Sequence, residues 1–388
     1  MSSASLRIAV FCAYYPPHVG GYERNVHELC WRLAAKGHDV LVVTSTAGKA
    51  ASCCKELDGV KVVGIPAWDI LGGTYPVPKP TLRLLRALKA VARFKPHVVN
   101  TQTRFFPTSL LGAIVACRLG ARHVHTERGT SHPVVANPLV SWLSRVYDHT
   151  LGHLVVSRAS LCIGVSTAAT QFARHLGAQE VAVVPNGIEV RPPSDDEVRR
   201  LRNLLAPNGE VLFCYVGRLV HGKGVHDLIR AFATTRENVP NSRLVLVGDG
   251  PSRGHLESLT ASLSLGNAVC FWGMADREAA MSVLTASDVF VNPSYTEGLP
   301  TTVLEAAALG RAIVATDVGG TCEIVCHDVS GLLCEPGDIA TLSDTLWTLA
   351  KGPSLRTRLG VEAQSHTVNF DWDNLCSRWE SVVGCCDG

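Results

Sequence analysis

Short apolar runs alternate with helical patterns along the whole chain. The runs are bounded by glycine, proline or polar residues, and they predict strands at 6–13, 39–45, 60–65, 97–102, 123–126, 161–166, 181–185, 211–217, 243–250, 268–273, 288–294 and 312–316. Runs that are apolar at nearly every position are typical of a parallel sheet covered on both faces. The first intervening helix is predicted over 22–36 and ends at Gly37, with an apolar face made of Val26, Leu29, Leu33 and Ala34.

This alternation predicts an α/β chain with two doubly wound, Rossmann-like domains. Residues 189–197 are polar, contain two adjacent prolines and interrupt the pattern, so we interpret them as a linker. The predicted domains are therefore 1–188 and 189–369, and a last helix over 372–383 has no strand after it. Ligands bind beyond the carboxyl ends of such strands, so we expect the active site in a cleft between two facing domains.

The composition fits a folded protein and does not indicate nucleic acid as a partner. Hydrophobic residues make up 46% of the 388 residues and charged residues 18%, which is enough apolar material for two cores. The net charge of +2 gives no reason to expect nucleic acid as a partner. The run at 6–13 is too short for a signal peptide and no long uncharged run predicts a membrane span, so we expect a cytoplasmic protein. The 14 cysteines contain no CxxC pair, which favours reduced thiols over a metal site.

The strongest candidate for chemistry is a pair of glutamates, Glu297 and Glu305, separated by seven residues. Pro300 suits the first position of a helix, and the amides of Thr301 and Thr302 would then point out of its N-terminus, where phosphate binds. Glu305 would lie about one turn further, within reach of a sugar hydroxyl. From the spacing alone, a capped helix with solvated glutamates is an equal alternative.

Two glycine-containing loops follow predicted strands. In 216–224, glycines flank Arg218 and Lys223, and two cations at a strand–loop–helix junction could clamp a diphosphate. Gly20 and Gly21 stand where the first strand gives way to the first helix, and they would allow the backbone to approach a ligand. The alternatives are an ordinary basic loop and a tight turn.

Taken together, these three segments resemble the retaining GT-B glycosyltransferases of family 4, also described as glycosyl transferases group 1. The sequences PNGI at 185–188, GDGP at 248–251 and FWG at 271–273 fit the same resemblance, which spans nearly the whole chain. It implies an acceptor-binding first domain, a donor-binding second domain and a C-terminal helix at 370–388 that crosses back to the first. It also implies transfer of a hexose from a UDP- or GDP-sugar to a lipid-linked, glycan or small-molecule acceptor, with no metal or other cofactor.

The resemblance assigns roles to the matching residues. Arg218 and Lys223 would bind the donor diphosphate, Glu305 the ribose, and Glu297 the hydroxyls of the transferred sugar. The other implied donor contacts are Gly20, Gly21, Gly248, Trp272, Gly273, Leu299, Thr301 and Thr302.

One position departs from the family pattern. Similar enzymes often carry a histidine-glycine pair after the strand that is here 123–126, and the histidine contacts the donor sugar. In this chain Arg128 precedes Gly129, His132 follows a few residues later and His125 lies upstream on the strand. Arg128 and His132 are equal candidates for the catalytic contact, unless the site is altered, and the alternative for each is a solvated loop side chain.

A helix predicted over 79–95 carries six cations and no acid. Four cations share one face and four apolar residues lie roughly opposite: Arg83, Arg86, Lys89 and Arg93 against Leu84, Leu85, Leu88 and Val91. This arrangement suits peripheral contact with an anionic membrane on the cytoplasmic face, or a sheet-packed helix with a solvated basic face. The apolar stretch 137–156 would form part of an acceptor groove or a core helix.

Two other functions fit the same architecture, a nucleotide-sugar epimerase and a non-catalytic sugar-nucleotide-binding protein. The Asp371-Trp372-Asp373 sequence matches a metal–diphosphate motif, but it precedes the last helix, where Asp371 suits the N-cap.

Overall fold

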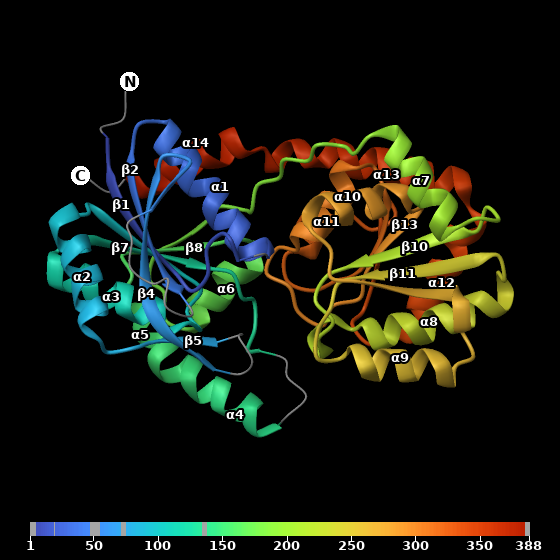
Figure 1. The fold of residues 1–388 in the computed structure, drawn as a ribbon, viewed down its shortest axis with the longest axis horizontal. Helices are drawn as coiled ribbons and strands as arrows, with labels where there is room; N and C mark the ends of the chain where they lie inside the picture. Colours follow the sequence, from blue (N-terminus) through green and yellow to red (C-terminus); the bar gives the residue numbers. More distant parts are fainter. Residues whose placement is uncertain (1–4, 19, 47–54, 71–74, 134–137, 385–388) are drawn as a thin grey trace. The chain divides into compact units, whose positions relative to one another are not determined.

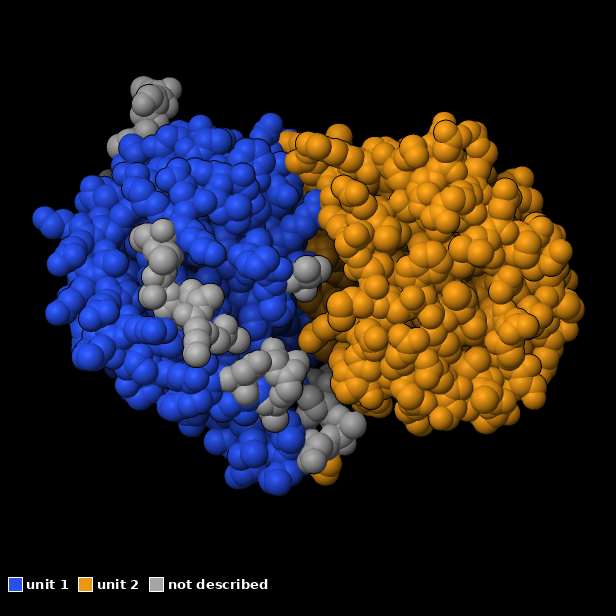
Figure 2. Space-filling view, in the orientation of Figure 1, with its two compact units in different colours: residues 1–133, 139–187, 372–388 blue, residues 134–138, 188–371 orange. Residues whose placement is uncertain are grey.

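A computed structural model of the protein describes residues 5–18, 20–46, 55–70, 75–133 and 138–384. The chain forms two compact units (Figures 1 and 2). Unit 1 comprises residues 1–133, 139–187 and 372–388, and unit 2 comprises residues 134–138 and 188–371. The main boundary therefore lies between Gly187 and Ile188.

Unit 1 is built on a nine-stranded sheet with the order β3-β4-β2-β1-β6-β7-β8-β9, and β5 pairs with β4. The strands are β1 Arg7–Cys12, β2 Asp39–Thr46, β3 Lys55–Leu57, β4 Val60–Ile70, β5 Tyr75–Pro78, β6 Val98–Gln102, β7 Arg122–Glu127, β8 Leu161–Gly164 and β9 Val181–Val183. The helices are α1 Gly21–Ala35, α2 Leu82–Phe94, α3 Pro107–Leu119, α4 Pro138–Tyr147, α5 His153–Ser157, α6 Thr167–His175 and α14 Trp372–Gly384. All pairings are parallel except those of β3 and β5 with β4.

The strands of unit 1 are apolar at consecutive positions because helices cover both faces of the sheet. Along β1, Ile8 and Val10 pack with α1 and α14, whereas Ala9 and Phe11 pack with α2 and α3. Each face thus has its own core, as the continuous apolar runs predict. The predicted apolar face of α1 is confirmed, and Gly37 follows the helix with a φ of 94°, where a residue without a Cβ is favoured.

The C-terminal helix α14 belongs to unit 1, as expected. It begins at Trp372, directly after Asp371. Trp379 is buried in the core shared with α1, and Glu380 accepts hydrogen bonds from Lys36 Nζ at 2.6 Å and pairs with His38 at 2.8 Å. The helix therefore closes the unit in which the chain begins.

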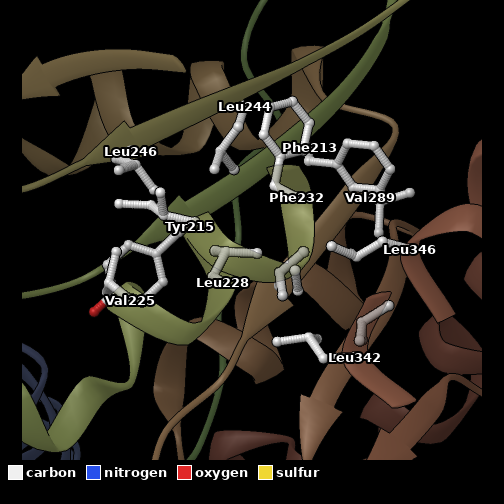
Figure 3. Close-up of a cluster of buried hydrophobic side chains, with 14 of the residues drawn as sticks. Phe213, Tyr215, Val225, Leu228, Phe232, Leu244, Leu246, Val289, Leu342 and Leu346 are labelled. Atoms are coloured by element: carbon white, nitrogen blue, oxygen red, sulfur yellow. The ribbon is translucent and has the colours of Figure 1, made fainter. Parts of the chain in front are cut away.

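Unit 2 contains a six-stranded, all-parallel sheet with the order β12-β11-β10-β13-β14-β15. The strands are β10 Val211–Val216, β11 Ser242–Val247, β12 Val269–Gly273, β13 Val289–Asn292, β14 Ala312–Thr316 and β15 Leu332–Cys334. The helices are α7 Asp195–Leu205, α8 Val225–Asn238, α9 Arg253–Ser262, α10 Arg277–Ala286, α11 Thr301–Ala308, α12 Ile339–Lys351 and α13 Pro353–His366. The core between the sheet and α8 and α12 is filled by Phe213, Phe232 and Leu346, among others (Figure 3).

The strand order of each sheet reverses beside its first strand. In unit 2, β10 lies between β11 and β13, so the loops that follow β10 and β13 start side by side. In unit 1, β1 lies between β2 and β6 in the same way. Such switch points open a crevice at the carboxyl edge of the sheet, which is where ligands bind in doubly wound folds.

Three details differ from the sequence interpretation. The predicted linker at 189–197 is partly wrong, because α7 begins at Asp195; the Ser194 hydroxyl caps it by accepting from the Glu197 amide, and its first turn is acidic. Pro300 is the N-cap residue of α11 rather than its first helical residue, because its ψ of 109° is extended. The short strands β3, β5 and β15 were not predicted.

The two amphipathic segments are surface helices. Arg83, Arg86, Lys89 and Arg93 of α2 are all exposed, while Ala87 and Val91 are buried against the sheet. Leu85, one of the four apolar residues set roughly opposite the cations, is 55% exposed and lies outside this buried face. Helix α4 exposes Leu139, Trp142 and Leu143, which contradicts a core helix for that part of 137–156. Within the described residues, no helix is long and apolar enough to cross a membrane.

Candidate active site

The loop after β10 is held in a fixed shape at the switch point of unit 2. The buried Tyr215 hydroxyl donates to the carbonyl of Arg218 at 3.0 Å and the Tyr295 amide donates to the carbonyl of Gly222 at 3.0 Å. Gly224 has a φ of 63°, and a Cβ there would lie 1.9 Å from the Pro293 carbonyl oxygen. The loops after β10 and β13 therefore pack backbone against backbone, with the exposed Arg218 side chain at their edge.

Lys223 and Glu297 meet across these two loops. Lys223 Nζ lies 2.6 Å from Glu297 Oε1, which also accepts hydrogen bonds from Ser294 Oγ at 2.7 Å and Asn292 Nδ2 at 3.3 Å. The Glu297 side chain is mostly buried, and that of Lys223 is 28% exposed. Burial, and then the Glu297 carboxylate, raise the pKa of Tyr215 above its usual range. The structure thus brings a cation and an anion predicted from separate segments into one ion pair.

The N-terminus of α11 lies in the same loop. No side-chain oxygen caps its first turn, so the amides of Thr301 and Thr302 have no partner within the helix. Both residues are half-buried, and Leu299 just before them is buried. Helix N-termini carry partial positive charge, so this end of α11 can bind an anion.

Glu305 lies one turn into α11 and is only 8% exposed. Arg277 Nε is 3.5 Å from its Oε1, and the same guanidinium donates to the Glu189 carbonyl at 2.7 Å. The predicted ribose-binding carboxylate is therefore beside a cation that the sequence interpretation did not single out.

The predicted base-framing residues lie on the neighbouring strands of unit 2. The Gly248 amide donates to the Gly273 carbonyl at 2.8 Å, where β11 and β12 end. Gly248 has a φ of 131°, and a Cβ there would lie 2.0 Å from the Gly217 carbonyl oxygen. Glycine is therefore required at position 248. The close backbone contact there joins the end of β11 to the loop after β10. Trp272, next to Gly273, is half-buried.

Gly20 and Gly21 lie at the switch point of unit 1, at the start of α1. A Cβ on Gly20 would lie 2.2 Å from an oxygen of the Glu23 side chain, which is buried and pairs with His18 at 2.8 Å. Gly20 therefore leaves room for the Glu23 side chain, so packing within the protein is enough to explain the glycine without a ligand.

Arg128 lies near the same glycine loop. Its guanidinium donates to Asn186 Oδ1 at 2.6 Å and to Gln102 Oε1 at 3.2 Å, and it lies 5.5 Å from the centre of the Tyr22 ring. Burial lowers the pKa of this guanidinium. Asn186 belongs to the PNGI segment and Tyr22 follows Gly21, so three predicted segments converge on Arg128.

His132 belongs to a largely buried network that also includes Glu127, which accepts a hydrogen bond from the Arg128 amide at 2.9 Å. Its Nδ1 is 2.7 Å from Asp148 Oδ2, and Asp148 also pairs with Arg104 Nε at 2.9 Å. Arg104 bridges to Glu127 at 2.9 Å, and both carboxylates are fully buried. Burial alone would raise the pKa of Glu127, but Arg104 and His125 lower it to about 2.

Sequence reasoning missed the residues that support these sites: Arg104, Glu127, Asp148, Asn186, Gln102 and Arg277. Arg104 and Glu127 did carry a signal, because each stands at or just after the carboxyl end of a predicted strand. Asp148 carried none, because it lies within an apolar stretch.

Two family profiles match complementary parts of the chain. The family described as Glycosyltransferase Family 4 matches residues 19–191, and the family described as glycosyl transferases group 1 matches residues 199–366. The first match covers the strands of unit 1 from β2 to β9, and the second covers all six strands of the unit 2 sheet.

Similar proteins match over nearly the whole length. An uncharacterized glycosyltransferase of Methanocaldococcus jannaschii is 27% identical over 97% of this chain and 98% of its own. The glycogen synthase of Mycobacterium tuberculosis is 28% identical over 97% of this chain and 94% of its own. Among solved structures, sucrose-phosphate synthase from Thermosynechococcus elongatus gives a TM-score of 0.80 at 23% identity, covering 97% of this chain and 98% of that one. The Anabaena protein HepE in complex with UDP-glucose gives 0.77 at 19% identity, covering 98% and 100%.

Proposed function

Because this chain belongs to the glycosyltransferases of the family 4 type, described as glycosyl transferases group 1, we propose that it moves a hexose from a UDP- or GDP-sugar to a lipid-linked or glycan acceptor with retention of configuration. It is an enzyme with two Rossmann-like domains, as the GT-B resemblance implies. Membership of this family favours glycosyl transfer over the two alternatives, an epimerase and a non-catalytic binding protein.

The observation that carries the proposal is that the loop after β10, which carries Arg218 and Lys223, lies beside the loop that leads into α11, and that Lys223 and Glu297 join the two loops. Breaking the bond between the sugar and the diphosphate leaves negative charge on the departing phosphate. In the proposed complex, Lys223 turns from Glu297 towards this phosphate, and Arg218 and the amides of Thr301 and Thr302 surround it. Fixed cations and amide dipoles stabilise that charge without further reorganisation.

The two glutamates would hold the hydroxyls of the donor. Glu297 would accept from the transferred sugar when Lys223 moves to the phosphate. Glu305 would accept from the ribose, with Arg277 fixing its carboxylate. The likeness to HepE, whose structure contains UDP-glucose, favours a uridine donor but rests on fold alone.

On unit 1, we assign the contact with the donor sugar to Arg128 rather than His132. Arg128 lies beside Tyr22 and Asn186, which belong to the glycine loop and the PNGI segment, and it directly precedes Gly129. His132 instead pairs with the buried Asp148, which Arg104 holds. The sugar would become oxocarbenium-like as the bond breaks, and the departing phosphate would take the acceptor proton on the same face.

A thermal-shift panel of UDP-, GDP- and ADP-sugars tests the donor. One donor is expected to raise the melting midpoint, because a ligand that binds only the folded state adds about 2.7 kcal/mol at 100 times its Kd. The matched nucleoside monophosphates, which lack the second phosphate, are expected to give much smaller shifts. Equal shifts with mono- and diphosphate compounds, or none with any donor, would contradict the proposed diphosphate site.

We further propose that α2 contacts anionic lipid, which would bring the enzyme to a lipid-linked acceptor. Its four exposed cations each add about 1 kcal/mol near an anionic surface. The protein is expected to float with vesicles that contain anionic lipid at low salt, and to lose this binding when Arg83, Arg86, Lys89 and Arg93 are all changed to Gln. The control changes Arg199 and Arg200 on α7 to Gln. Flotation that is equal with zwitterionic vesicles, or absent, would reject the proposal.

A further inference from the structure

Three histidine side chains from separate parts of unit 1 converge on one point. His132 lies in the loop after β7, His149 in the turn after α4 and His175 at the end of α6. Each offers one ring nitrogen, and these nitrogens all lie within 4.8 Å of one another. His132 is partly buried, and the other two are exposed. Imidazole nitrogens are the commonest protein ligands of zinc and similar transition metals.

The orientation of His132 is fixed by a buried carboxylate. Its Nδ1 lies 2.7 Å from Asp148 Oδ2, so Nδ1 carries the proton and Nε2 is left as the ligand nitrogen. Asp148 is fully buried and is held in turn by Arg104, whose Nε and second guanidinium nitrogen lie 2.9 and 3.0 Å from its two oxygens. A histidine held by a carboxylate on its other nitrogen is the usual arrangement around a bound metal.

The backbone between α4 and α5 supports the same arrangement. Residues Asp148–Gly152 form a π-helical turn, an irregularity that is frequently found at functional sites. The turn buries Asp148 and exposes the adjacent His149. The centre of the Phe172 ring lies 5.3 Å from that of His132 and 6.0 Å from that of His175, so an apolar ring packs beside two of the three imidazoles.

We propose that His132, His149 and His175 bind one divalent transition-metal ion of the Zn²⁺ class, with solvent as the fourth ligand. Zinc–nitrogen bonds of about 2.0–2.1 Å place ligand nitrogens about 3.4 Å apart in a tetrahedron. His149 and His175 are exposed, so rotation of their side chains can close the remaining distance. The ion is separate from glycosyl transfer: it ties the loop that carries Arg128 and His132 to the helices behind it.

Co²⁺ titration of the full-length protein, followed by visible absorption, tests this site. One Co²⁺ per chain is expected, with the intense ligand-field bands of a four-coordinate ion, and Zn²⁺ is expected to displace it. His149→Ala and His175→Ala should each weaken Co²⁺ affinity by more than the roughly 10- to 100-fold that is typical of changes around a metal ligand. Zn²⁺ should also raise the melting midpoint of the wild type more than that of either variant.

The matched control is His255→Ala, which removes an exposed histidine from unit 2 and should leave Co²⁺ binding unchanged. Melting in the presence of EDTA should be the same for all four proteins, since His149 and His175 are surface residues. The proposal is overturned if the wild type binds no Co²⁺, or if both variants bind it as tightly as the wild type. A sulfur-to-cobalt charge-transfer band that persists in the variants would place the ion on cysteine instead and would also overturn it.

Discussion

Replacing Lys223 with alanine is expected to lower kcat/KM by about 100- to 1,000-fold, the usual cost of removing one preorganised group that stabilises transition-state charge. Lys223 is the cation that the structure holds at the switch point, 2.6 Å from Glu297 Oε1. Without it, Arg218 and α11 alone would face the departing phosphate. Steady-state kinetics with the donor identified by the thermal-shift panel would measure the loss, and the donor-induced shift should fall with it.

The control for this variant is Lys351→Ala, which removes an exposed lysine at the end of α12 and should leave both the rate and the shift unchanged. The melting midpoint without donor separates a catalytic loss from a folding defect. Because Glu297 keeps its hydrogen bonds from Ser294 and Asn292, the unliganded variant should melt close to the wild type. Kinetic constants within a few-fold of the wild type would show that Lys223 does not bind the reacting phosphate.

Replacing Arg104 with alanine is expected to reduce the free energy of unfolding by about 3–5 kcal/mol, because it leaves buried charge without a partner. Arg104 is 2% exposed and pairs with Glu127 and Asp148, neither of which has any exposed surface. A typical domain has only about 5–15 kcal/mol to lose. Urea denaturation of the full-length protein, followed by far-UV circular dichroism and tryptophan fluorescence, would measure the change.

A lysine at the same position keeps the charge but loses the two-point contact with Asp148. Arg104→Lys should therefore lie between alanine and the wild type, and it remains measurable if Arg104→Ala does not fold. Arg83→Ala, an exposed arginine of α2, is the control and should change stability by less than about 0.5 kcal/mol. If the Arg104→Ala protein were as stable as this control, Glu127 and Asp148 would not depend on the charge of Arg104 for their burial.

The sequence predicts the architecture well because burial on both sheet faces leaves a direct pattern. Strands such as β1 and β10 are apolar at nearly every position, and that pattern needs no knowledge of their neighbours. β5 was missed because Pro76 and Pro78 disfavour a strand except at an edge, and the edge is known only from the sheet. The start of α7 could have been predicted from the sequence, because Ser194 and Glu197 have the spacing of a capping box.

The sequence predicted which segments carry the candidate site, but not how those segments are arranged in space. Arg218, Lys223 and Glu297 were singled out from glycine and helix-start signals, but their meeting depends on β10 and β13 being neighbours. The order of strands in a sheet cannot be predicted from the hydrophobic pattern of any single strand. The buried pairing of Arg104 with Asp148, and the convergence of His132 with His149, likewise join residues far apart in the chain, and no local spacing reports them.

Arg218, Lys223 and the N-terminus of α11 are proposed to bind the donor diphosphate. A crystal structure with the nucleoside diphosphate of the preferred donor is the most direct test of this proposal. We expect the terminal phosphate within hydrogen-bond distance of the Lys223 ammonium, the Arg218 guanidinium and the amides of Thr301 and Thr302, with the Lys223–Glu297 contact lengthened. A diphosphate bound away from the switch point of unit 2, with that contact still at 2.6 Å, would contradict the account.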